Sequence, residues 1–237
     1  GVVRRTRGGQ ITRRKAASVP QDSEPLISQF KPVEKKQGLL AAYLRALDNR
    51  PLSTKVITSG VICGVGDIMA QALAFKPAPG QVFTMGAFAK AVELQRFAIY
   101  GVIGALWIAP VVHYWFDLLE SVMKSPKGPP KTFAGKMGKA LKMVSLDQTI
   151  GAPVVNAGFM FLFTFATAVC TGTQGVQASR KSLDMVRGSI WSTLLVCWKI
   201  WPVANLINFA FVPANLRVLF MNFVGLGWNI YLSAAVN

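Results

Sequence analysis

The stretch MVSLDQTIGAPVVNAGFMFLFTFATAV, residues 143–169, decides the fold class of this chain. It is longer than the roughly 20 residues that a helix needs to cross the hydrocarbon core of a membrane. Residues 54–75, 96–122 and 216–236 form three further apolar stretches of that kind. Only helices satisfy their own backbone hydrogen bonds at that depth when the alternating pattern of a barrel is missing. We therefore predict an all-α integral membrane bundle of four transmembrane helices.

The composition agrees with this class. Of the 237 residues, 52% are hydrophobic and 15% are charged, against about 25% charged residues in ordinary soluble domains. Lys and Arg number 26 and Asp and Glu 10, an excess that would suggest nucleic acid in a soluble protein. Here the basic residues cluster between apolar stretches without a nucleic-acid-binding motif. We therefore expect them to set membrane topology, and we expect no nucleic acid to bind.

Cysteine usage and motifs argue against metal and catalytic chemistry. Cys63, Cys170 and Cys197 lie far apart, so neither a disulfide framework nor a metal-ligand spacing follows. The single histidine, His113, has no HExxH or GxSxG motif around it. No nucleophile, base and orienting group can be assembled from spacing. We predict no enzyme activity, no cofactor and no metal.

Charge divides the chain into a basic N-terminal extension, residues 1–36, and a membrane domain, residues 37–237. The extension begins GVVRRTRGGQITRRKAAS, an Arg-rich and acid-free composition that resembles an organelle-targeting sequence. One interpretation is a solvated tail with too little apolar area to fold. The other is a tail that lies on a protein partner, and we expect such partners besides the lipid bilayer. Homo-oligomerisation is left open.

Loop charge predicts the orientation in the membrane. The linker 123–142 carries six lysines and no acid, and the region before the first span is also basic. By the positive-inside rule, both chain ends face the inner compartment of a four-span protein. We expect the mitochondrial inner membrane, with both ends in the matrix, and keep plastid and peroxisomal membranes as alternatives.

An amphipathic helix is predicted over about 179–199, before the last span. Its apolar residues recur at helical spacing while Arg180, Asp184 and Arg187 lie away from them, so we expect it to lie along the membrane interface. The apolar stripe consists of Leu183, Val186, Ile190, Leu194 and Trp198.

A short connector helix is predicted in WPVANLINFAFVPANLR, residues 201–217. The residues between Pro202 and Pro213 would extend only about 15 Å as a helix, half of a bilayer. Pro202 suits the start of a helix and Pro213 a break before the last span.

Two asparagines mark one face of this connector. Asn205 and Asn208 are three residues apart and share a side of the helix. We expect this side to face the bundle, with both amides bonded to backbone or to the region of Asp67. Phe209 and Phe211 are expected in apolar surroundings.

Polar side chains within spans are costly and are candidates for function. A bundle that turned them inward would form a polar, partly hydrated interior, as in a pore. The alternative is a set of interhelical contacts that fix packing, worth about 1 kcal/mol each. The candidates are Asp67, Gln71, Arg96, His113, Asp147, Gln148, Asn205, Asn208 and Arg217. For His113, pH-dependent gating and a satisfied interhelical contact both remain open.

Small residues predict where helices approach closely. Gly60 and Gly64 form a GxxxG face in the first span, and Gly101 and Gly104 form a similar face in the second.

The C-terminal stretch WKIWPVANLINFAFVPANLRVLFMNFVGLGWNIYLS, residues 198–233, resembles the signature of the Mpv-seventeen / peroxisomal-membrane-protein-twenty-two family. Upstream, YLRALDNRPLSTK, GDIMAQ, RFAIYG, PVVHYWF and DQTIGAP match further family elements in order. The resemblance covers about residues 40–236; Asn205 stands where the family usually has Gln, and the extension before Gln37 is not a family feature. The signature falls on Trp201, Pro202, Asn205, Asn208, Phe209, Val212, Pro213, Arg217, Trp228, Asn229, Tyr231, Leu232 and Ser233.

The resemblance implies a small four-span protein of the mitochondrial inner membrane, the peroxisome or another organelle. Members are described as non-selective channels or as proteins of organelle homeostasis and mitochondrial DNA maintenance. Our leading hypothesis is a non-enzymatic organellar membrane protein that lines a path for small solutes. The alternative is a structural accessory subunit of a large membrane complex, docked through its basic extension.

Overall fold

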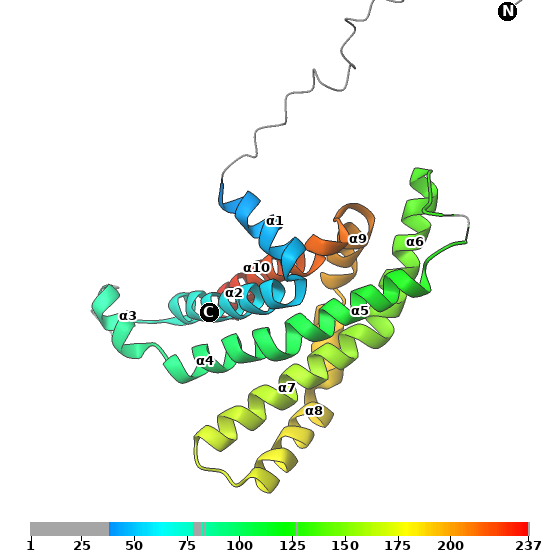
Figure 1. Cartoon of the computed structure of the whole chain (residues 1–237). Coiled ribbons are helices and arrows are strands. Elements are labelled where there is room, and N and C mark those ends of the chain that lie inside the picture. The colour runs from blue at the N-terminus through cyan, green and yellow to red at the C-terminus, as the bar shows by residue number, and fades with distance from the viewer. Residues whose placement is uncertain (1–37, 78–81, 83, 127, 237) are drawn as a thin grey trace, which may run out of the picture. The chain divides into compact units, whose positions relative to one another are not determined.

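The structure is a computed structural model that describes residues 38–77, 82, 84–126 and 128–236. The basic extension, and the protein partners expected on it, lie outside these residues. The predicted all-α class is confirmed, since the described residues form helices and no strand (Figure 1). In chain order the elements are α1 (Leu39–Asn49), α2 (Pro51–Ala74), α3 (Met85–Ala91), α4 (Leu94–Ile103), η2 (Gly104–Ile108), α5 (Ala109–Val122), α6 (Phe133–Leu146), η3 (Asp147–Gly151), α7 (Ala152–Cys170), α8 (Gly175–Cys197), α9 (Trp201–Phe211), η4 (Ala214–Leu216) and α10 (Arg217–Val236).

Three helical stretches are long and apolar enough to cross a membrane: α2, α4 to α5, and α6 to α7. They correspond to the predicted spans 54–75, 96–122 and 143–169. The third is longer than predicted, because Phe133–Cys170 runs on through 38 residues. Thr132 sets its start, since the Thr132 side chain accepts a hydrogen bond from the Gly135 N–H and caps the helix. The second half of the Lys-rich linker 123–142 is therefore helical.

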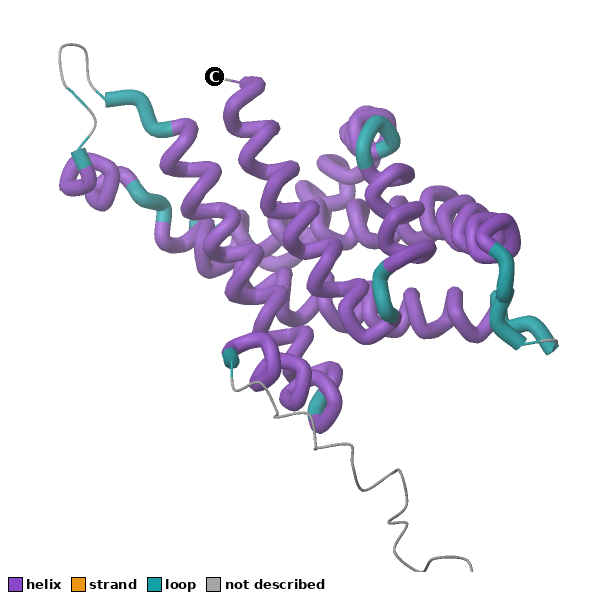
Figure 2. The backbone as a smooth tube through the Cα atoms, turned by 90° about the horizontal axis from the view of Figure 1, so that it is seen from above, coloured by secondary structure: helices purple, strands orange, loops and turns teal. Residues whose placement is uncertain are grey.

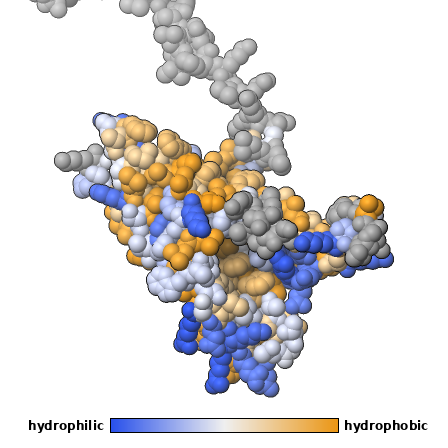
Figure 3. Space-filling model, turned by 180° about the vertical axis from the view of Figure 1, so that it is seen from behind, coloured by the Kyte–Doolittle hydropathy of each residue, from blue (hydrophilic) through white to orange (hydrophobic). Residues whose placement is uncertain are grey.

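The outer surface of these spans is apolar, as contact with lipid requires. Only 6% of the most apolar part of Phe133–Cys170 is buried, and Ile57 and Leu106 are 68% and 70% exposed. Figure 3 shows apolar residues over much of the face that it draws. Hydrophilic residues gather at its lower end, at the turn between α7 and α8. The bundle thus presents to its surroundings the residues that a soluble protein would bury.

Helix α8 forms where the amphipathic helix was predicted, and it doubles back beside α7 (Figure 1). Two small residues on it, Ala178 and Ser182, are fully buried, whereas Leu183 of the predicted apolar stripe is exposed. Together with α9, α8 is apolar enough to form a further span that is bent by 60°. Its position along a membrane interface stays a prediction.

The stretch predicted as the fourth span, 216–236, forms α10, and its crossing of the membrane stays a prediction. Helix α10 packs against α2 and runs in the same direction (Figures 1 and 2). The expectation of both chain ends on one side required α10 to run opposite to α2. The structure differs because α10 runs in the same direction as α2, as it would if α8 and α9 together formed the further, bent span. If α2 and α10 both cross the membrane, the end of α10 lies opposite the start of α2.

Two spans contain a π-helical turn just before an Ala-Pro pair. Proline has no N–H, and its ring collides with the carbonyl four residues earlier in a regular α-helix. Both turns widen instead: the Ala109 N–H bonds the carbonyl of Gly104, and the Ala152 N–H bonds the carbonyl of Asp147. Turns of this kind occur often at functional sites, and η3 begins with one of the candidate polar residues.

The predicted connector helix is present as α9, with Pro202 in its first turn, where a missing N–H costs nothing. Val212 ends the helix in an extended conformation just before Pro213. Helix α9 shares a core with α5, α6 and α10. This core consists of Phe116, Leu119, Ala140, Met143, Val144, Phe209 and Val218.

Candidate functional site

A partly open cavity of about 600 Å³ lies between the helices. Residues of α2, α4, η2, α5, η3, α7, α8, α9 and α10 line it. Ligand sites of small organic molecules usually measure about 300–1,000 Å³ and are lined mostly by apolar side chains. Most residues around this cavity are apolar, among them Phe159, Met160 and Met221. The carboxyl and amide side chains in its wall belong to Asp147, Gln148, Asn156, Asn205 and Asn222.

The Asp147 carboxylate is the centre of a buried polar cluster in this wall. The Trp115 indole donates its Nε1–H to Oδ1 at 2.9 Å. Both amide groups, Gln148 Nε2 and Asn205 Nδ2, donate to Oδ2 at 2.8 Å. Asp147, Gln148 and Asn205 are 6%, 8% and 3% exposed. The cluster therefore joins α5, η3 and α9, and we name these four residues the Asp147 cluster.

The local sequence explains how the Trp115 indole reaches Asp147. A Cβ atom on Gly151 would overlap the indole and would lie 2.8 Å from Asp147 Oδ1. Only glycine at this position leaves room for the ring. The π-turn matters as well, because the consecutive side chains of Asp147 and Gln148 are both buried within it. Trp115 was outside the predicted site, although an indole N–H inside a span signals a need for an acceptor.

Asp67 lies in a second, separate cluster in the C-terminal half of α2, and it does not line the cavity. Arg96 Nε and Asp67 Oδ1 are 2.9 Å apart and form an ion pair, but the geometry does not meet that of a hydrogen bond. Gln71 Nε2 donates to Asp67 Oδ2 at 2.7 Å, and Gln71 Oε1 accepts from the Glu93 N–H at 2.8 Å. Gln71 thus holds the start of α4 against α2, which is a packing role.

Arg217 lies in a third cluster at the junction of α9 and α10. Its Nη1 is 2.7 Å from Glu120 Oε1, and Glu120 also pairs with Lys139 of α6. Arg217 Nε donates to the Val212 carbonyl at 3.3 Å, at the end of α9. A cation at this place satisfies free carbonyls and interacts favourably with the helix dipole. The sequence suggested Arg217 but not its partner Glu120, nor the Lys139 that also pairs with Glu120.

His113 pairs with Lys55, a residue that the sequence interpretation did not single out. Lys55 is 5% exposed, and its Nζ lies 3.0 Å from His113 Nδ1. Because the ammonium is a donor only, Nδ1 accepts, and a neutral imidazole carries its proton on Nε2. Asp117 Oδ2 lies 3.5 Å from the same nitrogen. His113 therefore bridges α2 and α5 outside the cavity lining.

The two asparagines of α9 are both buried, as their shared face predicted, but their partners differ from the prediction. Asn205 bonds Asp147 and not the region of Asp67, because α9 packs against α6 and α10 rather than against the end of α2 that carries Asp67. The Asn208 amide has no hydrogen-bond partner among the described residues. Phe209 is buried, but Phe211 is 64% exposed on the outer side of α9.

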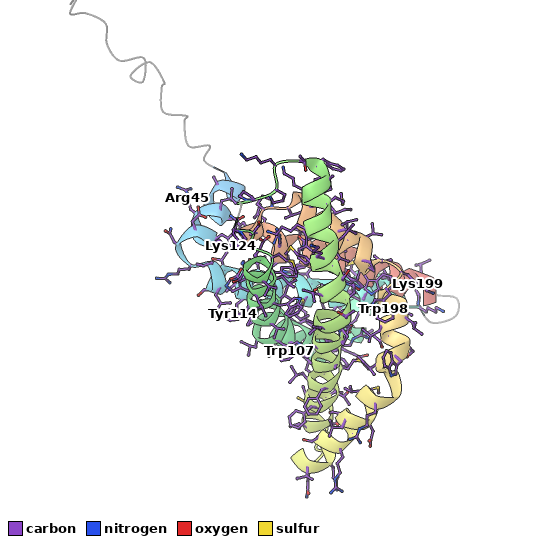
Figure 4. All side chains as sticks on the ribbon, turned by 90° about the vertical axis from the view of Figure 1, so that its right-hand side faces the viewer. Arg45, Trp107, Tyr114, Lys124, Trp198 and Lys199 are labelled. Atoms are coloured by element: carbon purple, nitrogen blue, oxygen red, sulfur yellow. The ribbon has the colours of Figure 1, made fainter. Side chains whose placement is uncertain are left out.

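The candidate packing glycines lie where α2 meets the second span. Gly60 faces Gly101 and Ala105, and a Cβ on Gly104 would come within 2.7 Å of Cys63. Gly64 instead faces the ring of Phe97. A further glycine was missed: the Trp107 ring occupies the place of a Gly158 side chain, and Trp107 donates Nε1–H to the Val155 carbonyl at 3.2 Å. Figure 4 labels Trp107 on the ribbon.

The expected single polar interior is thus several separate clusters, and of those that contain predicted residues only one borders the cavity. Of the nine candidate residues, Asp147, Gln148 and Asn205 come together in the cavity wall. Those around Asp67, His113 and Arg217 join pairs of helices elsewhere. Asn222, which also lines the cavity, donates to Ser59 Oγ at 2.7 Å and ties α10 to α2.

Comparison with known proteins identifies relatives along most of the chain. A model of the Mpv17 / PMP22 family matches residues 177–233. The PXMP2/4 family protein 2 of Dictyostelium discoideum is 31% identical over 197 residues, 82% of this chain and 89% of that protein. The mitochondrial inner membrane protein Mpv17 of Caenorhabditis briggsae is 31% identical over 83% of this chain and 92% of its own length. Protein SYM1 of Saccharomyces cerevisiae is 29% identical over 82% of this chain and 88% of its own length. No solved structure matches this chain.

Proposed function

Because this chain belongs to the Mpv17 / PMP22 family of organellar membrane proteins, we propose that it lines a path for small solutes across the mitochondrial inner membrane. The single observation that supports a path is the cavity of about 600 Å³, which lies between the spans, is partly open to the surroundings and is bordered by the Asp147 cluster. Close packing of side chains would leave less free volume between the helices of a bundle that served only as a scaffold. An unfilled volume beside buried polar groups is what a solute site requires.

The role we propose is non-enzymatic. The one carboxylate in the cavity wall is bonded to an indole and two amides, and none of these groups is a nucleophile or a base. Acid–base or covalent catalysis would need such a partner within hydrogen-bond reach. The donors around Asp147 hold a charge or a polar ligand in place, which suits binding and passage.

For the location, the proposal follows the names of relatives from Caenorhabditis briggsae, Caenorhabditis elegans and Xenopus laevis, each a mitochondrial inner membrane protein. For the orientation, the Lys-rich linker 123–142 and the start of α2 belong on the matrix side. The direction of α10 then puts its end on the opposite side, in place of the shared side first expected. Protease protection of a C-terminal tag in intact mitoplasts would distinguish the two orientations.

A pair of glycines on α10 tests the path. A Cβ on Gly225 would lie 3.8 Å from Trp201, in ordinary contact, and Gly225 lines the cavity. Gly227 is exposed, with nothing within 4 Å of its Cβ position. Gly225→Leu therefore fills cavity volume, whereas Gly227→Leu adds the same side chain on the outer side of the same helix.

The measurement is efflux of small neutral and charged solutes from liposomes that contain the purified full chain. We expect Gly225→Leu to lower the rate severalfold and Gly227→Leu to leave it near that of the unchanged protein. Protein-free liposomes give the leak rate. The proposal fails if the unchanged chain does not exceed this leak, or if both leucine variants conduct equally.

A further inference from the structure

The described residues contain two buried carboxylates, and they differ in one respect. Asp67 is 1% exposed and is paired with the guanidinium of Arg96. Asp147 is 6% exposed, and none of the described lysines, arginines or His113 forms an ion pair with it. A buried charge without a partner of opposite sign is strongly unfavourable. Arg96 compensates the charge of Asp67, whereas the hydrogen bonds to Asp147 come from neutral side chains.

The hydrogen bonds around Asp147 leave acceptors unused. An ionised carboxylate offers about four lone-pair sites, and three neutral donors occupy three of them. The amides of Gln148 and Asn205 must turn their NH₂ groups toward the carboxylate, since two facing oxygens would repel. Their oxygens therefore point away, and neither has a hydrogen-bond partner among the described residues. The Asp147 cluster thus has an excess of acceptors and a negative charge.

The surroundings determine which cation would suit this cluster. A bare metal ion prefers several oxygen ligands at a fixed short distance, whereas this carboxylate borders a cavity of about 600 Å³ with mostly apolar walls. A positively charged group with several N–H donors and an attached apolar body complements both parts. Such a group is an organic ammonium, with its hydrocarbon portion along Val155, Phe159 and Met160.

We propose that the cavity binds an ammonium group at Asp147, from either a free amine solute or the headgroup of an aminophospholipid. The inference deepens the proposed function and rests on it, because it names the chemical class of solute for the same cavity. Trp115, Gln148 and Asn205 position the carboxylate, and the charge of Asp147 selects the cation.

Calorimetric titration of the purified full chain in dodecyl maltoside tests this directly, since that detergent carries no ammonium. The probe is butylammonium chloride, and 1-butanol is the uncharged control of nearly the same shape. We expect saturable binding of butylammonium and at least about tenfold weaker binding of 1-butanol, from the loss of a charged hydrogen bond. Equal binding of the two probes would overturn the proposal, as would displacement of butylammonium by equimolar sodium chloride.

Variants assign the binding to one carboxylate. Asp147→Asn removes the charge and is expected to weaken butylammonium binding about tenfold or more. Asp184→Asn is the matched control, because Asp184 is an exposed acid of α8 outside the cavity lining. An unchanged affinity in Asp147→Asn contradicts the site. If that variant does not fold, the comparison of probes on the unchanged chain still decides the question.

Nanodiscs distinguish the two sources of the ammonium group. If phosphatidylethanolamine lowers the apparent affinity for butylammonium relative to phosphatidylglycerol, the headgroup occupies the site; if it does not, a free amine is the ligand. Liposome efflux separates this inference from the proposed function. If butylammonium binds but no efflux occurs, the ammonium site is supported and the proposed path fails. If efflux occurs but butylammonium does not bind, the path is supported and the ammonium site fails.

Discussion

The substitution Gly151→Ala tests whether the Asp147 cluster is held together as the structure indicates. A methyl group at this position would overlap the Trp115 indole and approach Asp147 Oδ1 to 2.8 Å. The ring must shift, and its hydrogen bond of 2.9 Å to the carboxylate is then lost. Hydrogen bonds to charged groups contribute about 1.5–3 kcal/mol in soluble proteins, and measured values within membranes average about 0.6 and reach about 1.7 kcal/mol. We therefore expect Gly151→Ala to lower the free energy of unfolding by about 1–2 kcal/mol.

Gly138→Ala is the matched control on the same continuous helix. Nothing lies within 4 Å of a Cβ at Gly138, and Ala in a helix interior is favoured over Gly by about 0.5–1 kcal/mol. The two identical substitutions should thus act with opposite sign. The assay is reversible unfolding by SDS in mixed micelles, followed by tryptophan fluorescence.

A double substitution checks the cause. Trp115→Ala removes the donor and the ring atoms that a Cβ at position 151 would meet. Added to Trp115→Ala, Gly151→Ala should therefore cost less than it does alone, a non-additivity above about 0.5 kcal/mol. The reasoning is refuted if Gly151→Ala is as stable as Gly138→Ala, or if the two substitutions add.

Three further sets of substitutions test other interhelical contacts with the same unfolding assay. Ser59→Ala leaves the buried Asn222 amide without its acceptor and should cost about 1–3 kcal/mol, while Ser59→Ala combined with Asn222→Leu should recover part of that loss. Arg217→Met leaves Glu120 with Lys139 alone and frees the Val212 carbonyl, so it should lower the free energy of unfolding. Arg217→Lys keeps the charge without the planar fork, and its stability should lie between those of Arg217→Met and the unchanged protein. Gly158→Ala should destabilise by displacing Trp107, whereas Gly188→Ala, with open space at its Cβ position, should not.

Hydropathy and proline positions predicted most of the helices, because both act within a short stretch of chain. The apolar stretches became α2, the second and third long helices and α10, and Pro202 and Pro213 bounded α9. Thr132 was a readable signal that the Lys-rich linker starts a helix, and it was overlooked. Local chemistry thus accounts for where helices begin and end.

The partners of the polar residues were not predictable in the same way. Spacing shows that Asn205 and Asn208 share a face, but it says nothing of how α9 is rotated against its neighbours. Only the packing decides that Asn205 meets Asp147 while Asn208 stays unpaired. Lys55 and Trp115 were missed for the same reason, since each acquires its importance from a partner on another helix. The doubling back of α8 beside α7 also depends on the packing of these two helices against each other.

The two π-turns show how one local device serves two purposes. Each precedes an Ala-Pro pair, and each closes with a bond from the alanine N–H to the first residue of the turn. That first residue is Gly104 in one span and Asp147 in the other. At Gly104 the missing side chain lets Cys63 approach so closely that a Cβ would stand 2.7 Å from it, and α2 packs tightly there. At Asp147 the side chain needs donors from other helices, and the cavity opens beside it. Replacing Asp147, with the π-turn left intact, is therefore the change that should shift the site beside the cavity toward the close packing seen at Gly104.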